Sequence, residues 1–263
     1  MSNPAPGQNY AIFASKIYVA DYDSSGTPKG WKWVGDSSKA QVSFTTEMKE
    51  HKEGYTGMNV TTASVIIGVA AKFEFETSNF SPENAAFMFN STLNTTTSGT
   101  VTDETVGSVT TAVGDLLPLA NVNVSAVTGV TDSSTGTPQA LTEGTHYSVN
   151  YATGSLNVLS LPSGFTGPIV VGGYSYGAST QVGAFTQLGT EKAFRVEGKN
   201  TADGSSVVLE IFRAKVEPIK DVNLITKDFV TLAVTCDVLA DPTKSSTDPH
   251  GDYVSFKQIP SAS

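Results

Sequence analysis

Few residues in this sequence of 263 could carry covalent chemistry. Gly173-Tyr174-Ser175-Tyr176-Gly177 matches the nucleophile-elbow pattern, and with a histidine and an aspartate elsewhere it would predict an esterase acting through Ser175. That motif requires a strand, a strained turn and then a helix, whereas residues 178–183 (ASTQVG) are poor helix formers. We therefore interpret the motif as a strand end relieved by glycines, and we expect no enzymatic activity.

The remaining reactive side chains predict neither a metal site nor a cofactor site. The histidines lack the pairwise spacing of metal ligands, so we interpret them as solvated loop or turn residues: His51, His146 and His250. The single cysteine, Cys236, cannot form an intrachain disulfide. Its place in the apolar run 229–238 predicts a buried and inert thiol.

Composition and charge limit the classes of function. With 39% hydrophobic residues, the chain is long enough for one large or two small cores. Its 16 basic and 25 acidic residues give a net charge of -9, which argues against a surface that neutralises phosphates. The first ten residues resemble no secretion signal, and the longest apolar run, 65–71, is shorter than the ~20 residues that span a bilayer. We therefore expect synthesis and assembly in the cytosol and no membrane association.

A run of charges, EMKEHKE at 47–53, is the most informative feature. A solvated hairpin tip is one interpretation. The other starts from the alternating sign of the charges, which suits a surface that meets a copy of itself displaced along an axis. Because head-to-tail stacking requires a heterologous interface, a mixed-charge loop would fix its orientation and register. The candidate contact residues are Glu47, Lys49, Glu50, His51, Lys52, Glu53 and Tyr55.

The elements on either side of this run must position it. Residues 42–46 alternate with period two, as in a half-buried strand, and residues 65–75 form a long β-branched and aromatic strand. The alternation at the end of this second strand places Phe73 and Phe75 on one face and carboxylates on the other. Ser81-Pro82-Glu83 then predicts a helix start, with Ser81 as the cap.

The composition changes after this helix. No lysine or arginine occurs between Lys72 and Lys192, and Ser, Thr, Gly and Val dominate residues 91–180. Short β patterns at regular spacing predict a small β-sandwich, immunoglobulin-like in the loose sense, inserted at 93–182 between two parts of one domain, 1–92 and 183–263. Residues 94–111 have so few bulky side chains that we expect a linker or an extended arm there.

After the insert, the sequence pattern resembles that of residues 1–92 again. Strands are predicted at 191–198, 206–215, 229–238 and 253–259. Residues 216–226 form a connection broken by proline, with room for a short helix. The predicted fold class is therefore mainly β: a barrel or sandwich with one short helix, plus the inserted β-sandwich.

These patterns resemble the tail tube proteins, or major tail proteins, of long-tailed bacteriophages. The likeness rests on the order of strand, charged loop KEHKEGYTG, long strand and helix opened by FSPEN. It continues in EGTHYSVNYATGSLNVL, NTADGSSVVLEIFRAKVEP and FVTLAVTCDVLADPTK. The resemblance implies a virion protein of tail-tube type, whose inserted domain lies on the outer surface. In that family the corresponding loop reaches between adjacent rings.

The same resemblance implies partners. It predicts rings, hexameric in the family, that stack around a tape-measure protein and contact tail terminator and baseplate proteins. DNA would pass through the lumen during ejection without specific binding. One alternative from another class is a bacterial surface or pilus-like adhesion module with an immunoglobulin-like binding domain, which would require a secretion route.

Overall fold

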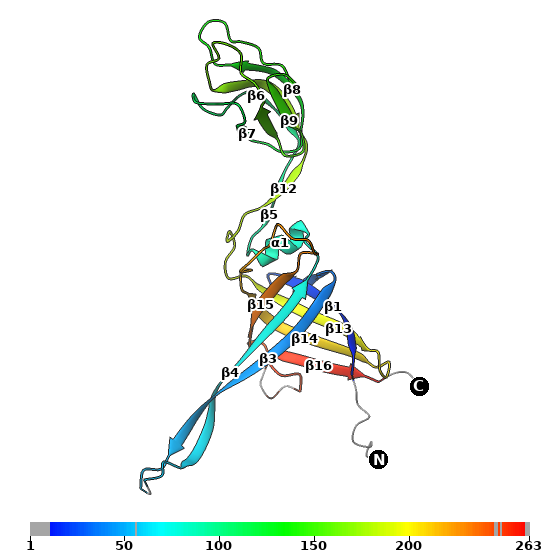
Figure 1. The fold of residues 1–263 in the computed structure, drawn as a ribbon. Helices are drawn as coiled ribbons and strands as arrows, with labels where there is room; N and C mark the ends of the chain where they lie inside the picture. Colours follow the sequence, from blue (N-terminus) through cyan, green and yellow to red (C-terminus); the bar gives the residue numbers. More distant parts are fainter. Residues whose placement is uncertain (1–10, 56, 245–246, 248, 261–263) are drawn as a thin grey trace. The chain divides into compact units, whose positions relative to one another are not determined.

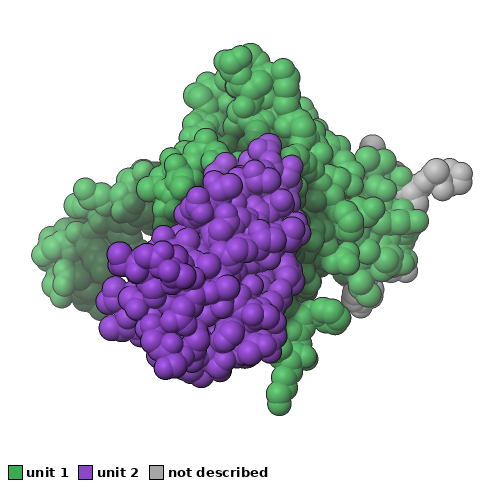
Figure 2. Space-filling model, turned by 90° about the horizontal axis from the view of Figure 1, so that it is seen from above, with its two compact units in different colours: residues 1–93, 182–263 green, residues 94–181 purple. Residues whose placement is uncertain are grey.

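A computed structural model describes residues 11–55, 57–244, 247 and 249–260. Within these ranges the chain has sixteen strands and one short helix (Figure 1), which confirms the predicted mainly-β class. The chain divides into two compact units, coloured separately in Figure 2. Unit 1 comprises residues 1–93 and 182–263, and unit 2 comprises residues 94–181. Each unit has its own hydrophobic core.

Unit 1 is built on one antiparallel sheet with the strand order β2-β1-β13-β14-β15-β4-β3, and β16 pairs with β14 next to β15. Its strands are β1 (Phe13–Tyr22), β2 (Pro28–Trp33), β3 (Ser37–Lys52), β4 (Thr61–Thr77), β13 (Glu191–Asn200), β14 (Ser206–Val216), β15 (Leu232–Leu239) and β16 (Val254–Ile259). Among the described strands, β2 and β3 each pair on one side only, and not with each other. The sheet therefore stays open and does not form a closed barrel.

A cluster of aromatic rings shows how strongly this sheet curves. β4 and β13 are separated by β14 and β15, which would place them about 14 Å apart in a flat sheet. Nevertheless, the ring centroids of Phe73 on β4 and Phe194 on β13 are 5.3 Å apart, and those of Phe75 and Phe194 are 5.8 Å apart. All three side chains are at most 1% exposed. The sheet thus wraps around its own core.

The predicted alternation in β4 is confirmed. Phe73 and Phe75 face the core, whereas Glu74 and Glu76 are partly exposed on the other side. There the Lys39 Nζ atom lies 3.1 Å from a carboxylate oxygen of Glu74. Period-two alternation therefore separates an apolar face from a charged one.

The helix α1 (Pro82–Met88) closes one end of this core and begins where the sequence predicts. The Asn84 backbone N–H donates to Ser81 Oγ at 3.2 Å, so Ser81 is the N-cap, and Pro82 occupies the first turn. Phe87 stacks on Phe75 at 6.5 Å between ring centroids. The helix therefore adds its apolar face to the core of unit 1.

Unit 2 contains two three-stranded sheets, β7-β10-β9 and β6-β11-β8, that share one core. Their strands are β6 (Gly99–Val106), β7 (Leu116–Pro118), β8 (Val124–Asp132), β9 (Tyr147–Asn150), β10 (Ser155–Val158) and β11 (Ile169–Tyr176). This is a small β-sandwich, as predicted. Immunoglobulin domains have at least seven strands, so the described strands support the sandwich and not that particular topology.

Two local expectations are wrong. Residues 94–111 are largely paired strand: β5 (Leu93–Thr96) pairs with β12 (Ser179–Val182), and β6 pairs with β11. The backbone groups of β6 pair with residues about 63–77 positions away in the sequence, which local composition does not reveal. The connection 217–231 contains no helix. Its fixed points are instead hydrogen bonds to other elements, such as Ile219 N–H to the Met88 carbonyl at 3.0 Å.

The ring cluster predicts a large difference between buried and exposed phenylalanines of unit 1. Phe194→Ala should lower the free energy of unfolding of unit 1 by about 3–5 kcal/mol, because it leaves a cavity in a packed core. Phe44→Ala is the matched control, since Phe44 is 68% exposed, and it should have a far smaller effect. Both tryptophans, Trp31 and Trp33, belong to unit 1, so tryptophan fluorescence in denaturant reports this unit selectively. Equal destabilisation by the two variants would contradict the assigned core.

Candidate interaction site on the long hairpin

The residues singled out for covalent chemistry do not form a site. Ser175 lies within β11 and pairs with Thr100 and Ser125 on its two sides. The next element is the strand β12, so the described chain lacks the strand-turn-helix geometry of a nucleophile elbow at this point. Cys236 is fully buried, and burial raises the pKa of its thiol. Among the described residues, no cluster of three or more His, Cys, Asp or Glu side chains could hold a metal ion.

The charged run lies on a long hairpin formed by β3 and β4. The two strands pair from Ser37 opposite Thr77 to Lys52 opposite Thr61. β4 also pairs with β15, but only over residues 71–77. The remaining paired part of the hairpin, residues 45–52 and 61–70, is therefore a two-stranded ribbon that extends beyond the rest of the unit 1 sheet (Figure 1). Its β3 segment rises by about 24 Å from residue 45 to residue 52.

The expectation of a charged loop at 47–53 is therefore wrong for most of its length. Residues 47–52 belong to β3, because their backbone groups pair with residues 61–68 of β4. Glu53 follows the strand, is buried, and its N–H donates to the Val60 carbonyl at 3.0 Å. Tyr55 lies in the turn and is 86% exposed. The seven candidate residues thus occupy one end of the ribbon and its tip.

Strand geometry sends these charges to two opposite faces. Glu47, Lys49 and His51 alternate with Met48, Glu50 and Lys52 along β3. The alternation of sign along the chain consequently does not become a single charged strip. Within the described residues, Glu47, Lys49, Glu50 and Lys52 form no salt bridge, although Thr61 Oγ1 donates to Glu50 at 3.3 Å. Their charges remain available to a partner.

One face of the ribbon carries an apolar strip, formed by Phe44, Met48, Ile66 and Val69. On β3, residues 42 and 44 lie opposite the buried Phe73 and Ala71, so this face is continuous with the core face. Farther out, Thr46 pairs with Val69 and Met48 with Ile66 across a β-bulge that gives β4 one extra residue.

The strip continues the core pattern past the place where the core ends. Its four members are 56–68% exposed, whereas Phe73 and Ala71 are at most 5% exposed. Full burial of one such side chain stabilises by about 1.5–3 kcal/mol, so a partner that covers the strip gains several kcal/mol before the cost of association. A monomer leaves this gain unused.

Sequence reasoning missed this strip, although its signals were present. The alternation of residues 42, 44 and 46 extends naturally to Met48, which lies within the charged run. The opposite strand supplies the apolar run 65–71. Local composition drew attention to the charges, whereas the pairing register shows the apolar side chains between them.

The chain belongs to the family described as "Protein of unknown function UCP028589", whose model matches residues 10–257. A search of curated proteins found no match. In the part of the chain that the structure describes, no helix is long and apolar enough to cross a membrane.

The ribbon predicts a gradient of backbone protection. In unassembled protein, amides of residues 45–52 and 61–70 should exchange with deuterium at least tenfold faster than those of residues 71–77, because the ribbon lacks a third strand and a packed face. Hydrogen exchange with mass spectrometry measures this, with residues 193–196 of β13 as the protected reference. Equal protection along the whole of β4 in a verified monomer would contradict an uncovered ribbon.

Proposed function

We propose that this protein is a structural subunit that polymerises as stacked rings into a tube. The observation that carries the proposal is the β3–β4 hairpin, in which the edge strand β3 has 16 residues and one face carries the uncovered apolar strip. Unpaired strand edges invite pairing with another chain, and folded proteins usually blunt or cover them. In this protein the long edge is left open.

The two open edges of the unit 1 sheet could pair between neighbouring copies in a symmetric ring. The sheet ends at β2 on one side and at β3 on the other, and these are different surfaces. A contact between them is heterologous, and repetition of a heterologous contact generates a ring when the rotation closes. Closure would remove both edges, as in a barrel.

The polar face of the β3–β4 hairpin suits the inside of such a ring. It carries Gln41, Ser43, Thr45, Lys72 and Glu74 on the side away from the core. Lys72 is held by Glu217 at 3.0 Å and Asp237 at 3.2 Å, so its charge is balanced locally. With a net charge of -9, the protein offers little to retain phosphates, and DNA could slide through without specific binding.

The charged end of the ribbon suits contacts between successive rings. Glu47, Glu50, Lys49 and Lys52 are exposed and lie at the far end of unit 1 from α1. Charges of both signs fix orientation and register in such a contact. We assign the same contact to His51 and Tyr55, which are also exposed. Glu53, the remaining candidate, is buried, so its side chain is not placed to contact another ring.

The sequence resemblance makes the proposal specific. It supports a tail tube protein of a long-tailed bacteriophage, assembled in the host cytoplasm and carried in the virion tail. Its further partners would be a tape-measure protein and the tail terminator and baseplate proteins. The protein would then be a conduit for DNA ejection and not an enzyme.

Charge reversal at the ribbon end tests the stacking role. Lys49→Glu with Lys52→Glu should leave the free energy of unfolding within about 1 kcal/mol of wild type, since exposed charges contribute little. The same variant should stop tube growth at concentrations where wild type forms tubes, as seen by negative-stain electron microscopy and sedimentation.

The matched control is Lys49→Arg with Lys52→Arg, which keeps the charge and should form tubes. Tubes of normal length from the Glu variant would remove these lysines from the contact. A wild-type protein that stays strictly monomeric at high concentration, without rings or tubes, would overturn the proposed function itself.

Unit 2 should be dispensable for the tube. Replacement of residues 94–181 by a short Gly-Ser linker should preserve tubes, because unit 1 has a separate core and contains both open edges. Electron microscopy should show thinner particles with the same axial repeat. Loss of assembly by a variant whose tryptophan-detected unfolding is normal would show that unit 2 takes part in the contacts.

A further inference from the structure

The β14–β15 loop, residues 217–231, exposes three large apolar side chains of unit 1. Leu224, Ile225 and Phe229 are 80%, 92% and 93% exposed. The loop is nevertheless anchored at both ends. Ile219, Val222 and Val230 pack against the core, and the Glu217 N–H donates to the Thr235 carbonyl at 2.9 Å. The fold therefore holds three large apolar groups out in solvent.

Unit 1 also has an apolar groove where β16 and β3 diverge. Its walls include Phe13, Phe44, Val254 and Phe256, with Val207 and Leu209 of β14 also lining it. Its volume is about 440 Å³, and none of its lining residues is charged. Phe44 belongs to the apolar strip as well, so the groove is continuous with the surface already assigned to self-association.

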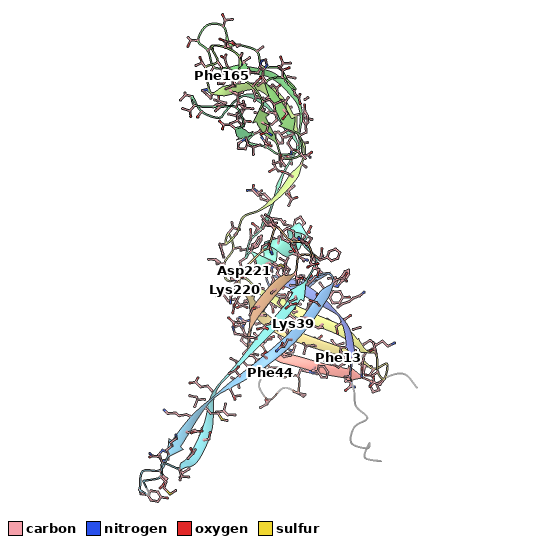
Figure 3. The ribbon with its side chains drawn as sticks, viewed as in Figure 1. Phe13, Lys39, Phe44, Phe165, Lys220 and Asp221 are labelled. Carbon is pink, nitrogen blue, oxygen red and sulfur yellow. The ribbon has the colours of Figure 1, made fainter. Side chains whose placement is uncertain are left out.

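The loop and the groove lie at opposite ends of β14. Leu209 lines the groove, and Val216, the last residue of β14, precedes the loop about 24 Å farther along the strand. Figure 3 shows the same separation, with Phe13 and Phe44 lower in the view than Lys220 and Asp221. The loop of one chain therefore cannot fill the groove of the same chain.

We propose that the β14–β15 loop of one copy inserts Leu224, Ile225 and Phe229 into the groove between β3 and β16 of a second copy. This contact deepens the proposed function and rests on it. Because the loop and the groove are different surfaces at opposite ends of β14, the contact is heterologous and propagates along one axis. It adds an apolar contact to the charged one at the end of the ribbon.

Size and chemistry favour this occupant. A cavity of about 150 Å³ holds a benzene ring, so the groove has room for about three groups of that size. The loop presents three such groups. Its flanking charges, Lys220, Asp221, Lys227 and Asp228, balance one another and leave no net charge at the entrance. Uncharged walls would offer nothing to a phosphate or to a strongly charged peptide.

Two conservative cysteine substitutions test the contact in the full-length protein. Thr226→Cys places a thiol beside Ile225 and keeps the three apolar side chains, and Ser15→Cys places one on the groove wall. The native Cys236 is fully buried and does not interfere. The two variants are mixed under assembly conditions and oxidised. In the control mixture, Val113→Cys replaces Ser15→Cys. Val113 is an exposed residue of unit 2.

We expect disulfide-linked dimers that contain one chain of each variant, at least tenfold more abundant than in the control mixture. Assembled particles without this mixed dimer would overturn the inference while leaving the proposed function intact. If mixed dimers are no more abundant than homodimers of Thr226→Cys, the loops contact each other. That result would also overturn the inference. Wild-type protein that never assembles would overturn both.

A second measurement gives the same inference an energetic test. Ile225→Asp with Phe229→Asp should raise the concentration required for assembly at least tenfold, with unchanged tryptophan-detected unfolding. Val113→Asp is the control and should leave that concentration unchanged. Normal assembly of the double variant would show that another segment fills the groove.

Discussion

The contact of Phe73 and Phe75 on β4 with Phe194 on β13 is the interaction on which the rest of unit 1 depends. It draws together strands that lie three positions apart in the sheet order, so the sheet curls around one core. Curvature without closure leaves β2 and β3 as separate edges. The same curvature brings β3 to face β16 across the apolar groove. The core therefore creates the surfaces that the folded chain leaves uncovered.

The β3–β4 hairpin continues the alternation of apolar and polar side chains beyond the packed core. β3 and β4 keep their apolar and polar faces beyond residue 71, where β15 and the packed core end. A strand usually becomes polar on both faces once it leaves the protein, because exposed apolar patches promote association. Here the apolar face persists through Met48, Ile66 and Val69. Among the described residues, no other segment of the chain buries that face.

Unit 2 is organised in a different way. Its two small sheets share one core, and its chain enters and leaves through the paired strands β5 and β12. Tyr174 illustrates its internal bonding: the phenol donates to Glu104 and accepts from Asn121, and burial raises its pKa. The unit contains no lysine or arginine, so its surface is acidic. Its sheets contribute no strand to the eight-stranded sheet of unit 1.

The sequence by itself determined the mainly-β class, the alternating faces of β4, the cap of α1 and the buried Cys236, since each depends on residues close together in the chain. Only the tertiary structure decided that Glu47–Lys52 continue a strand, that residues 94–111 are largely paired, and that the β14–β15 loop and the apolar groove lie at opposite ends of β14. These features depend on partners far away in the sequence. Local periodicity records which face a side chain takes, whereas register and curvature decide whether anything covers it.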